Sequence, residues 1–262
     1  MRPQKKKNRY NCFVEIKVVK TRKFLPPKDN LWSLIKESVP SLSENSIVAI
    51  TSKVVSIGEG RCIPVKDSSS KEKIIIDQSE FYIKRSGNYK SRIHTISQGM
   101  LVGSAGIDES NSNGYYILWP DNPDESARKI WKFLRKEYGV KNVGVILTDS
   151  MAVPLKRGIV GRAISYYGFV YLKNYVGSND LFGRKFKYTR TNIPDSLAAF
   201  AVYLMGEGRE QTPIVILENL PGIKFVTKKP FYKKRFTSWK VPLEEDLFRP
   251  FWNAVKWKKG GR

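Results

Sequence analysis

Three acidic residues stand where the sequence changes character. Asp108 follows S-A-G-I, Asp149 follows the apolar run V-I-L-T, and Glu207 lies between Gly206 and Gly208. Acidic residues are scarce in this chain, with 24 Asp and Glu against 47 Lys and Arg. Carboxylates and hydroxyls are the ligands that Mg²⁺ and Mn²⁺ prefer, and these ions also bridge to phosphates. The pattern is consistent with a divalent-metal site, although aspartates also cap turns without any metal.

Other polar residues near these acids are suited to a phosphorylated ligand. Ser110, Asn111 and Ser150 offer further oxygens, and the segment 155–162 (L-K-R-G-I-V-G-R) offers Arg157. Arginine suits bidentate recognition of phosphate or carboxylate, and the alternative for so basic a chain is an ordinary surface loop. The patterns G-x-x-x-x-G-K-[ST] and G-x-G-x-x-G are missing, so the standard nucleotide loops are excluded.

Histidine and cysteine counts restrict the chemistry further. The only histidine, His94, excludes multi-histidine zinc sites and argues against Ser-His-Asp chemistry; the segment R-I-H-T-I-S favours a strand there. Two cysteines, Cys12 and Cys62, exclude a disulfide framework and favour a cytoplasmic location. No apolar run approaches the roughly 20 residues that span a bilayer, so no membrane partner is expected.

The net charge of +23 indicates an anionic partner, either a phosphorylated ligand or nucleic acid. Basic residues are densest at 5–7, 228–235 and 256–262, and the first and last groups are expected to be mobile terminal tails. Solvated surface lysines are the alternative explanation, because runs of charge alone are weak evidence. Nucleic-acid binding through the basic segments therefore stays one open hypothesis.

Regular elements are predicted around the acidic positions. Asn30 is expected to cap a short helix that ends before Pro40, and Asn122 a longer helix that Gly139 closes. A further helix is expected from the apolar spacing in 197–205. Strands are expected at 12–20, 47–50, 142–147 and 213–217, a strand pair or a bulged strand at 93–107, and a polar loop at 66–73. Strands and helices mix without a regular period, which indicates an α+β or irregular α/β class.

Six segments in order resemble the coenzyme F420 γ-glutamyl ligase family. They are T-S-K-V-V-S-x-G-E-G-R, S-A-G-I-D-E-S-N, G-V-I-L-T-D-S, K-R-G-x-V-G-x-A-I, N-D-L-F-G-R and A-A-F-A-x-x-L-M-G-E-G. The resemblance covers roughly residues 12–220. It divides the chain into a basic tail (1–11), a ligase-like catalytic region (12–220) and a basic, aromatic extension (221–262).

The resemblance implies an α+β fold with a mixed sheet, two-lobed and intertwined in a homodimer. It implies an enzyme that uses GTP and Mg²⁺ or Mn²⁺ to add L-glutamate to an acceptor carboxylate through an acyl phosphate. The implied metal ligands are Asp108, Asp149, Ser150 and Glu207, and Asp108, Asp149 and Arg157 are the implied catalytic residues. The implied nucleotide contacts are Arg22, Lys23, Phe24, Leu25, Ser52, Lys53, Asn111, Met205, Gly206, Gly208, Arg209, Glu210, Gln211 and Thr212.

The sequence departs from the family pattern on the substrate side. Ile57 stands where the family usually has a lysine, Val153 where it usually has an arginine, and R-K-F-L at 22–25 replaces L-P-L-I. The metal residues are kept, so the resemblance implies that the ligase chemistry is retained. The acceptor stays open between the F420 precursor and a folate, because both present a carboxylate on a flat heterocyclic ligand.

Overall fold

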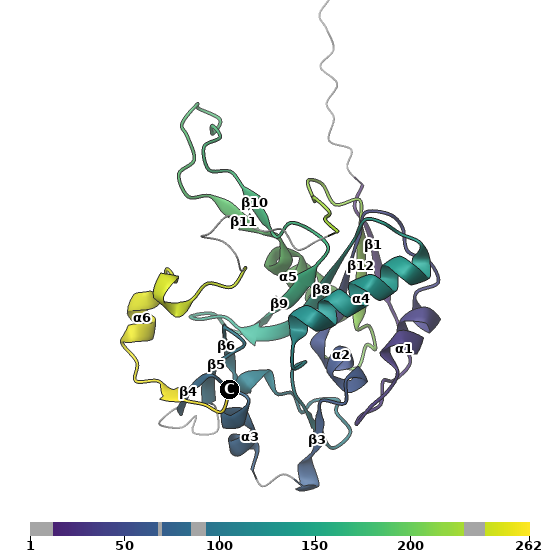
Figure 1. Cartoon of the computed structure of the whole chain (residues 1–262), viewed down its shortest axis with the longest axis vertical. Helices are drawn as coiled ribbons and strands as arrows, with labels where there is room; N and C mark the ends of the chain where they lie inside the picture. Colours follow the sequence, from purple (N-terminus) through teal and green to yellow (C-terminus); the bar gives the residue numbers. More distant parts are fainter. Residues whose placement is uncertain (1–12, 68–69, 85–92, 228–238) are drawn as a thin grey trace, which may run out of the picture.

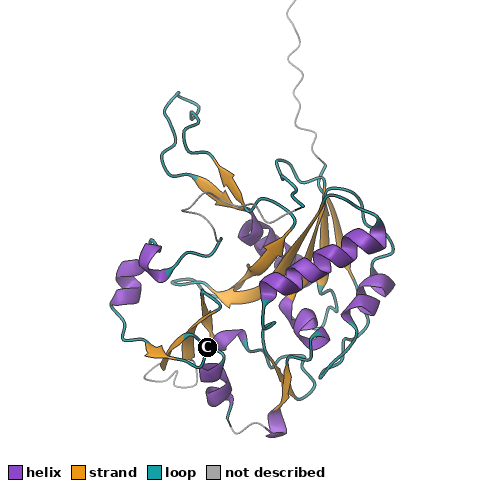
Figure 2. Cartoon of the chain, in the orientation of Figure 1, coloured by secondary structure: helices purple, strands orange, loops and turns teal. Residues whose placement is uncertain are grey.

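The computed structural model describes residues 13–67, 70–84, 93–227 and 239–262. Its centre is a mixed five-stranded sheet in the order β1-β12-β2-β8-β9 (Figures 1 and 2). The strands are β1 (Glu15–Val19), β2 (Ser46–Thr51), β8 (Val143–Ala152), β9 (Ile159–Tyr167) and β12 (Ile214–Glu218). Only β2 and β8 pair in parallel; the other neighbours are antiparallel. The predicted α+β class with a mixed sheet is confirmed.

Both faces of this sheet are buried, which explains the continuous apolar runs in its strands. In β8, Val145 and Leu147 face one core together with helices α1 (Leu31–Ser38), α2 (Ser52–Gly58) and α4 (Pro123–Tyr138). Ile146 faces a second core, built on helix α5 (Ile193–Met205). Figure 1 shows α4 across one face of the sheet and α5 behind it. The sheet is therefore the middle layer of three.

The helix termini follow the capping residues that the sequence supplies. Asn30 accepts a hydrogen bond from the Ser33 amide at 3.0 Å and starts α1. Asn122 does the same for Glu125 at 3.1 Å at the start of α4, and Gly139 ends α4 in the left-handed region with φ of 68°. Both predicted helices are confirmed at these bounds. Such caps satisfy amide groups that have no partner inside the helix.

A second, antiparallel sheet has the order β13-β4-β5-β6 and packs on a small core of its own. Its strands are β4 (Phe81–Lys84), β5 (Ile93–Ser97), β6 (Met100–Gly103) and β13 (Lys258–Lys259). The predicted strand pair in 93–107 is confirmed, and His94 lies in β5 opposite Gly103. Helix α3 (Lys71–Asp77) packs beside this sheet, so the predicted loop at 66–73 is wrong for its last three residues.

The remaining elements are short. Strands β3 (Cys62–Pro64) and β7 (Tyr115–Ile117) pair below the central sheet, and β10 (Leu172–Asn174) pairs with β11 (Arg190–Asn192). The chain between β10 and β11 forms an arm that projects from the body of the molecule (Figure 2). Single turns or short helices complete the structure: η1 (Val65–Asp67), η2 (Ser104–Gly106), η3 (Leu243–Glu245) and α6 (Arg249–Asn253).

The basic C-terminal group is not a mobile tail. Lys258 and Lys259 form β13 and pair with Tyr82 and Phe81 of β4. The Gly260 amide donates to the Glu80 carbonyl at 2.9 Å, and the Arg262 guanidinium binds Asp121 at 2.6 Å. The expectation of mobility is therefore wrong for this group, because backbone pairing with β4 fixes it. The basic groups at 5–7 and 228–235 lie outside the described residues.

Gly161 is the closest point between β9 and α5. A Cβ atom built on it would lie 2.5 Å from the Ala198 carbonyl oxygen and 2.5 Å from the Val202 Cβ. The second glycine of the K-R-G-x-V-G segment is therefore required by helix–sheet packing. Gly161 also pairs with Ser150, so this contact sets where the β8 site residues lie relative to α5.

We expect Gly161→Ala to lower the free energy of unfolding by about 1–3 kcal/mol, because the added methyl group overpacks a rigid contact. Gly103→Ala is the matched control, since Gly103 has an ordinary φ of −73° and open space around it. Its free energy of unfolding should stay within about 0.5 kcal/mol of the wild type. Urea unfolding of both variants measures this, and equal stabilities would contradict the packing argument.

Candidate active site

A cleft of about 860 Å³ opens where β2 ends beside the middle of β8. β2 and β8 are parallel and Thr51, the last residue of β2, pairs with Thr148, so the residues after β2 lie beside Asp149 and Ser150 of β8 at the edge where β2 ends. Ligand sites are common at such edges. All but one of the residues predicted from the resemblance line this cleft: Arg22, Lys23, Phe24, Leu25, Ser52, Lys53, Asp108, Asn111, Asp149, Ser150, Met205, Gly206, Glu207, Gly208, Arg209, Glu210, Gln211 and Thr212.

Asp149 lies inside β8 rather than at its end. The strand predicted to stop at Leu147 continues to Ala152, with a β-bulge between Leu147 and Thr148. Bulges re-aim side chains and are frequent beside active sites. The extra residue is Ile164 on β9, because Leu147 pairs with Ser165 and Thr148 with Ala163; Asp149 and Ser150 follow this point in β8 and line the cleft.

The Asp149 carboxylate is held by two donors. The Trp119 indole N–H donates to its Oδ2 atom, and the Ser150 amide donates to Oδ1 at 2.8 Å. Burial raises the pKa of Asp149 to about 6, and the negative charge of Asp108 adds to this, while the two donors and Lys53 act in the opposite direction. Asp149 is therefore a carboxylate that ionises only a little below neutral pH.

Asp108 reaches the cleft from the other side. Its backbone pairs with Ile117 at 3.0 and 2.8 Å, which fixes the chain after η2. The Lys53 ammonium lies 2.6 Å from its Oδ2 atom, and Ser110 donates to Oδ1 from its amide at 2.7 Å and its hydroxyl at 2.8 Å. Burial alone would raise the pKa of Asp108, but the charge and hydrogen bond of Lys53 outweigh it and lower that pKa.

Glu207 begins the loop that follows α5. The Ser150 hydroxyl donates to its Oε1 atom at 2.5 Å, which joins this loop to β8. The loop is closed by a hydrogen bond from the Gly208 amide to Glu210 at 2.8 Å and by Asn111, whose side-chain amide donates to the Gly208 carbonyl at 2.7 Å. Gly206 has a φ of +74° and would clash with Glu210 if it carried a Cβ atom.

The N-terminal contact segment lies beside the same loop. The Thr21 amide donates to the Gln211 carbonyl at 2.8 Å, which holds residues 22–25 at the cleft. Arg22 is paired within its own segment: it binds Asp29 at 2.6 and 2.9 Å and Glu37 at 3.0 Å. The hydrogen bonds from Arg22 hold the pKa of Asp29 well below its usual range.

The oxygen atoms in the cleft have the chemistry that Mg²⁺ or Mn²⁺ requires. In the described ranges of the chain, however, no three His, Cys, Asp or Glu side chains gather closely enough to hold a metal ion. Asp108 is neutralised by Lys53, and Glu207 accepts from Ser150. The metal assignment thus stays a prediction that the type of donor supports.

Two residues depart from the predicted site. Arg157 lies exposed between β8 and β9 and does not line the cleft of its own chain. Ile57 lines the cleft at the position where the family usually has a lysine, and its side chain is 2% exposed.

Trp119 is a site residue that the sequence did not predict, because nothing in L-W-P indicates a hydrogen bond to a residue 30 positions away. Its ring covers Gly106, where a Cβ atom would lie 2.1 Å from Trp119.

Comparison with known proteins defines the class. The family described as F420-0:Gamma-glutamyl ligase matches residues 20–219. The chain therefore belongs to the F420-0:gamma-glutamyl ligase family, whose members are amide-forming ligases. The resemblance inferred from the six segments is confirmed.

Three similar proteins carry the same name. The chain is 35% identical to the coenzyme F420:L-glutamate ligase of Methanopyrus kandleri, across 79% of this chain and 87% of that protein. It is 34% identical to the enzyme of the same name from Methanocaldococcus jannaschii, across 84% of this chain and 90% of that protein. The Archaeoglobus fulgidus enzyme of that name is 30% identical across 79% and 88%.

The hydrogen bond from Trp119 makes a testable contribution to the ionisation of Asp149. Trp119→Phe removes an N–H donor that favours the carboxylate, so the pKa of Asp149 should rise above its value of about 6. The expected rise is about one pH unit, from the net value of one charge-assisted hydrogen bond. A carboxyl carbon NMR titration measures it, and Trp32→Phe, outside the cleft, should leave the pKa unchanged.

Ionisation of Asp149 also links stability to pH. Its pKa in the folded chain, about 6, is above its ordinary value of 3.8. The protonated form therefore favours the folded state; this contribution is complete below about pH 3.8 and is lost as the pH rises through about 6. At neutral pH the fold thus carries an ionised carboxylate that a cation in the cleft would stabilise.

Proposed function

We propose that the chain is a GTP- and divalent-metal-dependent ligase that joins L-glutamate to the carboxylate of the F420 precursor. The observation that carries this proposal is the cleft itself. It collects carboxylates and expected nucleotide contacts from segments that are far apart in the sequence, namely 22–25, 52–53, 108–111, 149–150 and 205–212. The names of the similar ligases supply glutamate and the coenzyme as substrate classes.

The proposed reaction has two steps, a phosphoryl transfer and an amide-bond formation. An oxygen of the acceptor carboxylate attacks the γ-phosphorus of GTP, and GDP leaves, which gives an acyl phosphate. The amino nitrogen of glutamate then attacks the acyl carbon; inorganic phosphate leaves and the amine loses a proton. Such phosphoryl transfer depends on positioning and charge stabilisation rather than on a protein nucleophile. This agrees with a chain that has one histidine and two cysteines.

The acidic and the basic residues of the cleft have different proposed roles. Asp108, Asp149, Ser150 and Glu207 would hold Mg²⁺ or Mn²⁺, which when bound neutralises charge on phosphate oxygens. Lys53 is one of the cations lining the cleft, and its ammonium group already lies against Asp108. A metal ion at the carboxylates would release Lys53 to contact a phosphate, because both cations compete for the same oxygen.

Asp108 and Glu109 provide a matched pair of neighbouring acids. Asp108 lines the cleft, whereas Glu109 binds Lys71 at 2.7 Å and does not. Asp108→Ala should lower metal-dependent GDP release, in the presence of acceptor and glutamate, by about a hundredfold or more. Glu109→Ala should stay within about twofold, since its ion pair is exposed. Full turnover by Asp108→Ala or Asp149→Ala would refute the metal assignment.

A homodimer is part of the proposal, and the arm between β10 and β11 supports it. Leu181, Phe182 and Tyr188 on this arm are 97%, 94% and 83% exposed. Neighbouring large apolar side chains at such exposure are typical of association surfaces. The arm carries N-D-L-F-G-R at 179–184, one of the six segments in which the chain resembles the family.

We expect Leu181→Ala with Phe182→Ala to shift the chain from dimer to monomer in sedimentation velocity, because the variant removes the apolar tip of the arm. Phe13→Ala is the control: Phe13 is 81% exposed but lies just before β1. Its sedimentation should match the wild type. An unchanged dimer in the arm variant would place the association surface elsewhere.

Two broader predictions are not decided by the structure. A cytoplasmic location stays a proposal from cysteine usage, and in the described parts of the chain no helix is long and apolar enough to cross a membrane. Nucleic-acid binding was inferred from the net charge and from the basic, aromatic segment 225–257, of which residues 228–238 lie outside the described residues. The family assignment favours the ligase over that alternative.

A further inference from the structure

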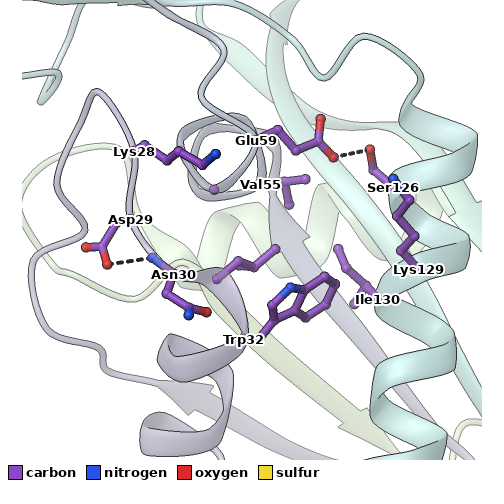
Figure 3. Close-up of a pocket in the computed structure, with 11 residues that line it drawn as sticks. Lys28, Asp29, Asn30, Trp32, Val55, Glu59, Ser126, Lys129 and Ile130 are labelled. Carbon is purple, nitrogen blue, oxygen red and sulfur yellow. Dashed lines mark hydrogen bonds between the residues drawn. The ribbon is translucent and has the colours of Figure 1, made fainter.

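A second cavity of about 510 Å³ lies between helices α1, α2 and α4. Figure 3 shows its lining: the Trp32 indole, Val55 and Ile130 form the inner wall, and Lys28 and Lys129 lie on either side. This volume is within the range of sites for small organic ligands. None of its lining residues lines the larger cleft, so it is a separate cavity.

The wall of this second cavity suits a flat apolar group. Val55 and Ile130 are 1% exposed and belong to the core, so the wall they form is rigid. Trp32 is 37% exposed and stacks at 4.8 Å on Phe133, which fixes its ring at the rim. A half-exposed indole beside aliphatic side chains offers a planar surface on which an aromatic ring can stack.

The charges around this cavity favour an anion. Of the two acids in the lining, Asp29 is neutralised by Arg22, whereas Glu59 accepts a hydrogen bond from the neutral Ser126 hydroxyl at 2.5 Å and keeps its negative charge. Lys28 and Lys129 form no ion pair with any residue that the structure describes. These two ammonium groups outnumber the single unneutralised carboxylate of Glu59, so the net charge of the lining favours an anion.

We propose that this second cavity is a binding site for a small planar aromatic anion, with the ring on Trp32, Val55 and Ile130 and the charge between Lys28 and Lys129. The site is distinct from the nucleotide and acceptor cleft. Helix α2 lies between them: Ser52 and Lys53 at its start line the cleft, while Val55 and Gly58 line the second cavity. Its ligand binds without occupying the position of either substrate.

The test uses anilinonaphthalene sulfonate, a planar aromatic anion whose fluorescence rises in an apolar site, on the full chain. Lys129→Glu should weaken the affinity for this probe about tenfold, because a positive charge that attracts the sulfonate is replaced by a negative charge that repels it. Lys132→Glu is the matched control: it makes the same charge change one turn away on α4 but does not line the cavity. Its affinity should stay within twofold of the wild type.

A neutral probe and three competitors separate the ring from the charge. Phenylnaphthylamine, the uncharged relative of the probe, should bind wild type and Lys129→Glu equally. Naphthoate and naphthyl phosphate should displace the sulfonate, and the stronger of the two identifies the head group; naphthol, which keeps the ring and lacks the charge, should displace it only at higher concentration. Equal losses in Lys129→Glu and Lys132→Glu, or no loss in either, would overturn the proposal. These readouts measure binding alone, so they are independent of ligase activity.

Discussion

The parallel pairing of β2 and β8 is the constraint on which the cleft depends. It is the only parallel pair in the central sheet, and it places the end of β2 beside the middle of β8. Because helix α2 starts directly after β2, Ser52 and Lys53 come to lie beside Asp149. The two apolar cores on either side of the sheet hold this pair rigid, so the cleft is built at the edge of the best-packed part of the molecule.

The charges in the cleft are arranged so that two nearby carboxylates remain tolerable. Asp108 and Lys53 neutralise each other, and Asp149 is held by donors instead of by an ion pair of its own. The pKa values of the two acids consequently move apart: burial raises that of Asp149, whereas Lys53 lowers that of Asp108. A site of this kind gains from a bound cation at neutral pH, because its second negative charge is hydrogen-bonded only by neutral donors and shares Lys53 with Asp108.

Local features of the fold were predictable, and long-range ones were not. The caps at Asn30 and Asn122 and the apolar strands follow from neighbouring residues, so the sequence predicts them well. The list of cleft residues came from resemblance, since no local rule connects residue 108 with residue 149. The register shift between β8 and β9, the Lys53–Asp108 pair and the Trp119 contact depend on how distant segments pack together, and the pattern of a single sequence carries no signal for such contacts.

The C-terminal segment shows why charge alone was a poor guide to function. It lies beyond residues 20–219, which match the family, yet β13 completes the sheet that contains β6, and the chain continues from β6 through η2 to Asp108. Gly260 packs against Ser79 with no space for a side chain, and Arg262 reaches Asp121. Basic residues here thus cover a strand edge that would otherwise expose unpaired backbone groups. Some of the basic residues of this chain therefore have a structural role, in the sheet from which the chain leads to Asp108.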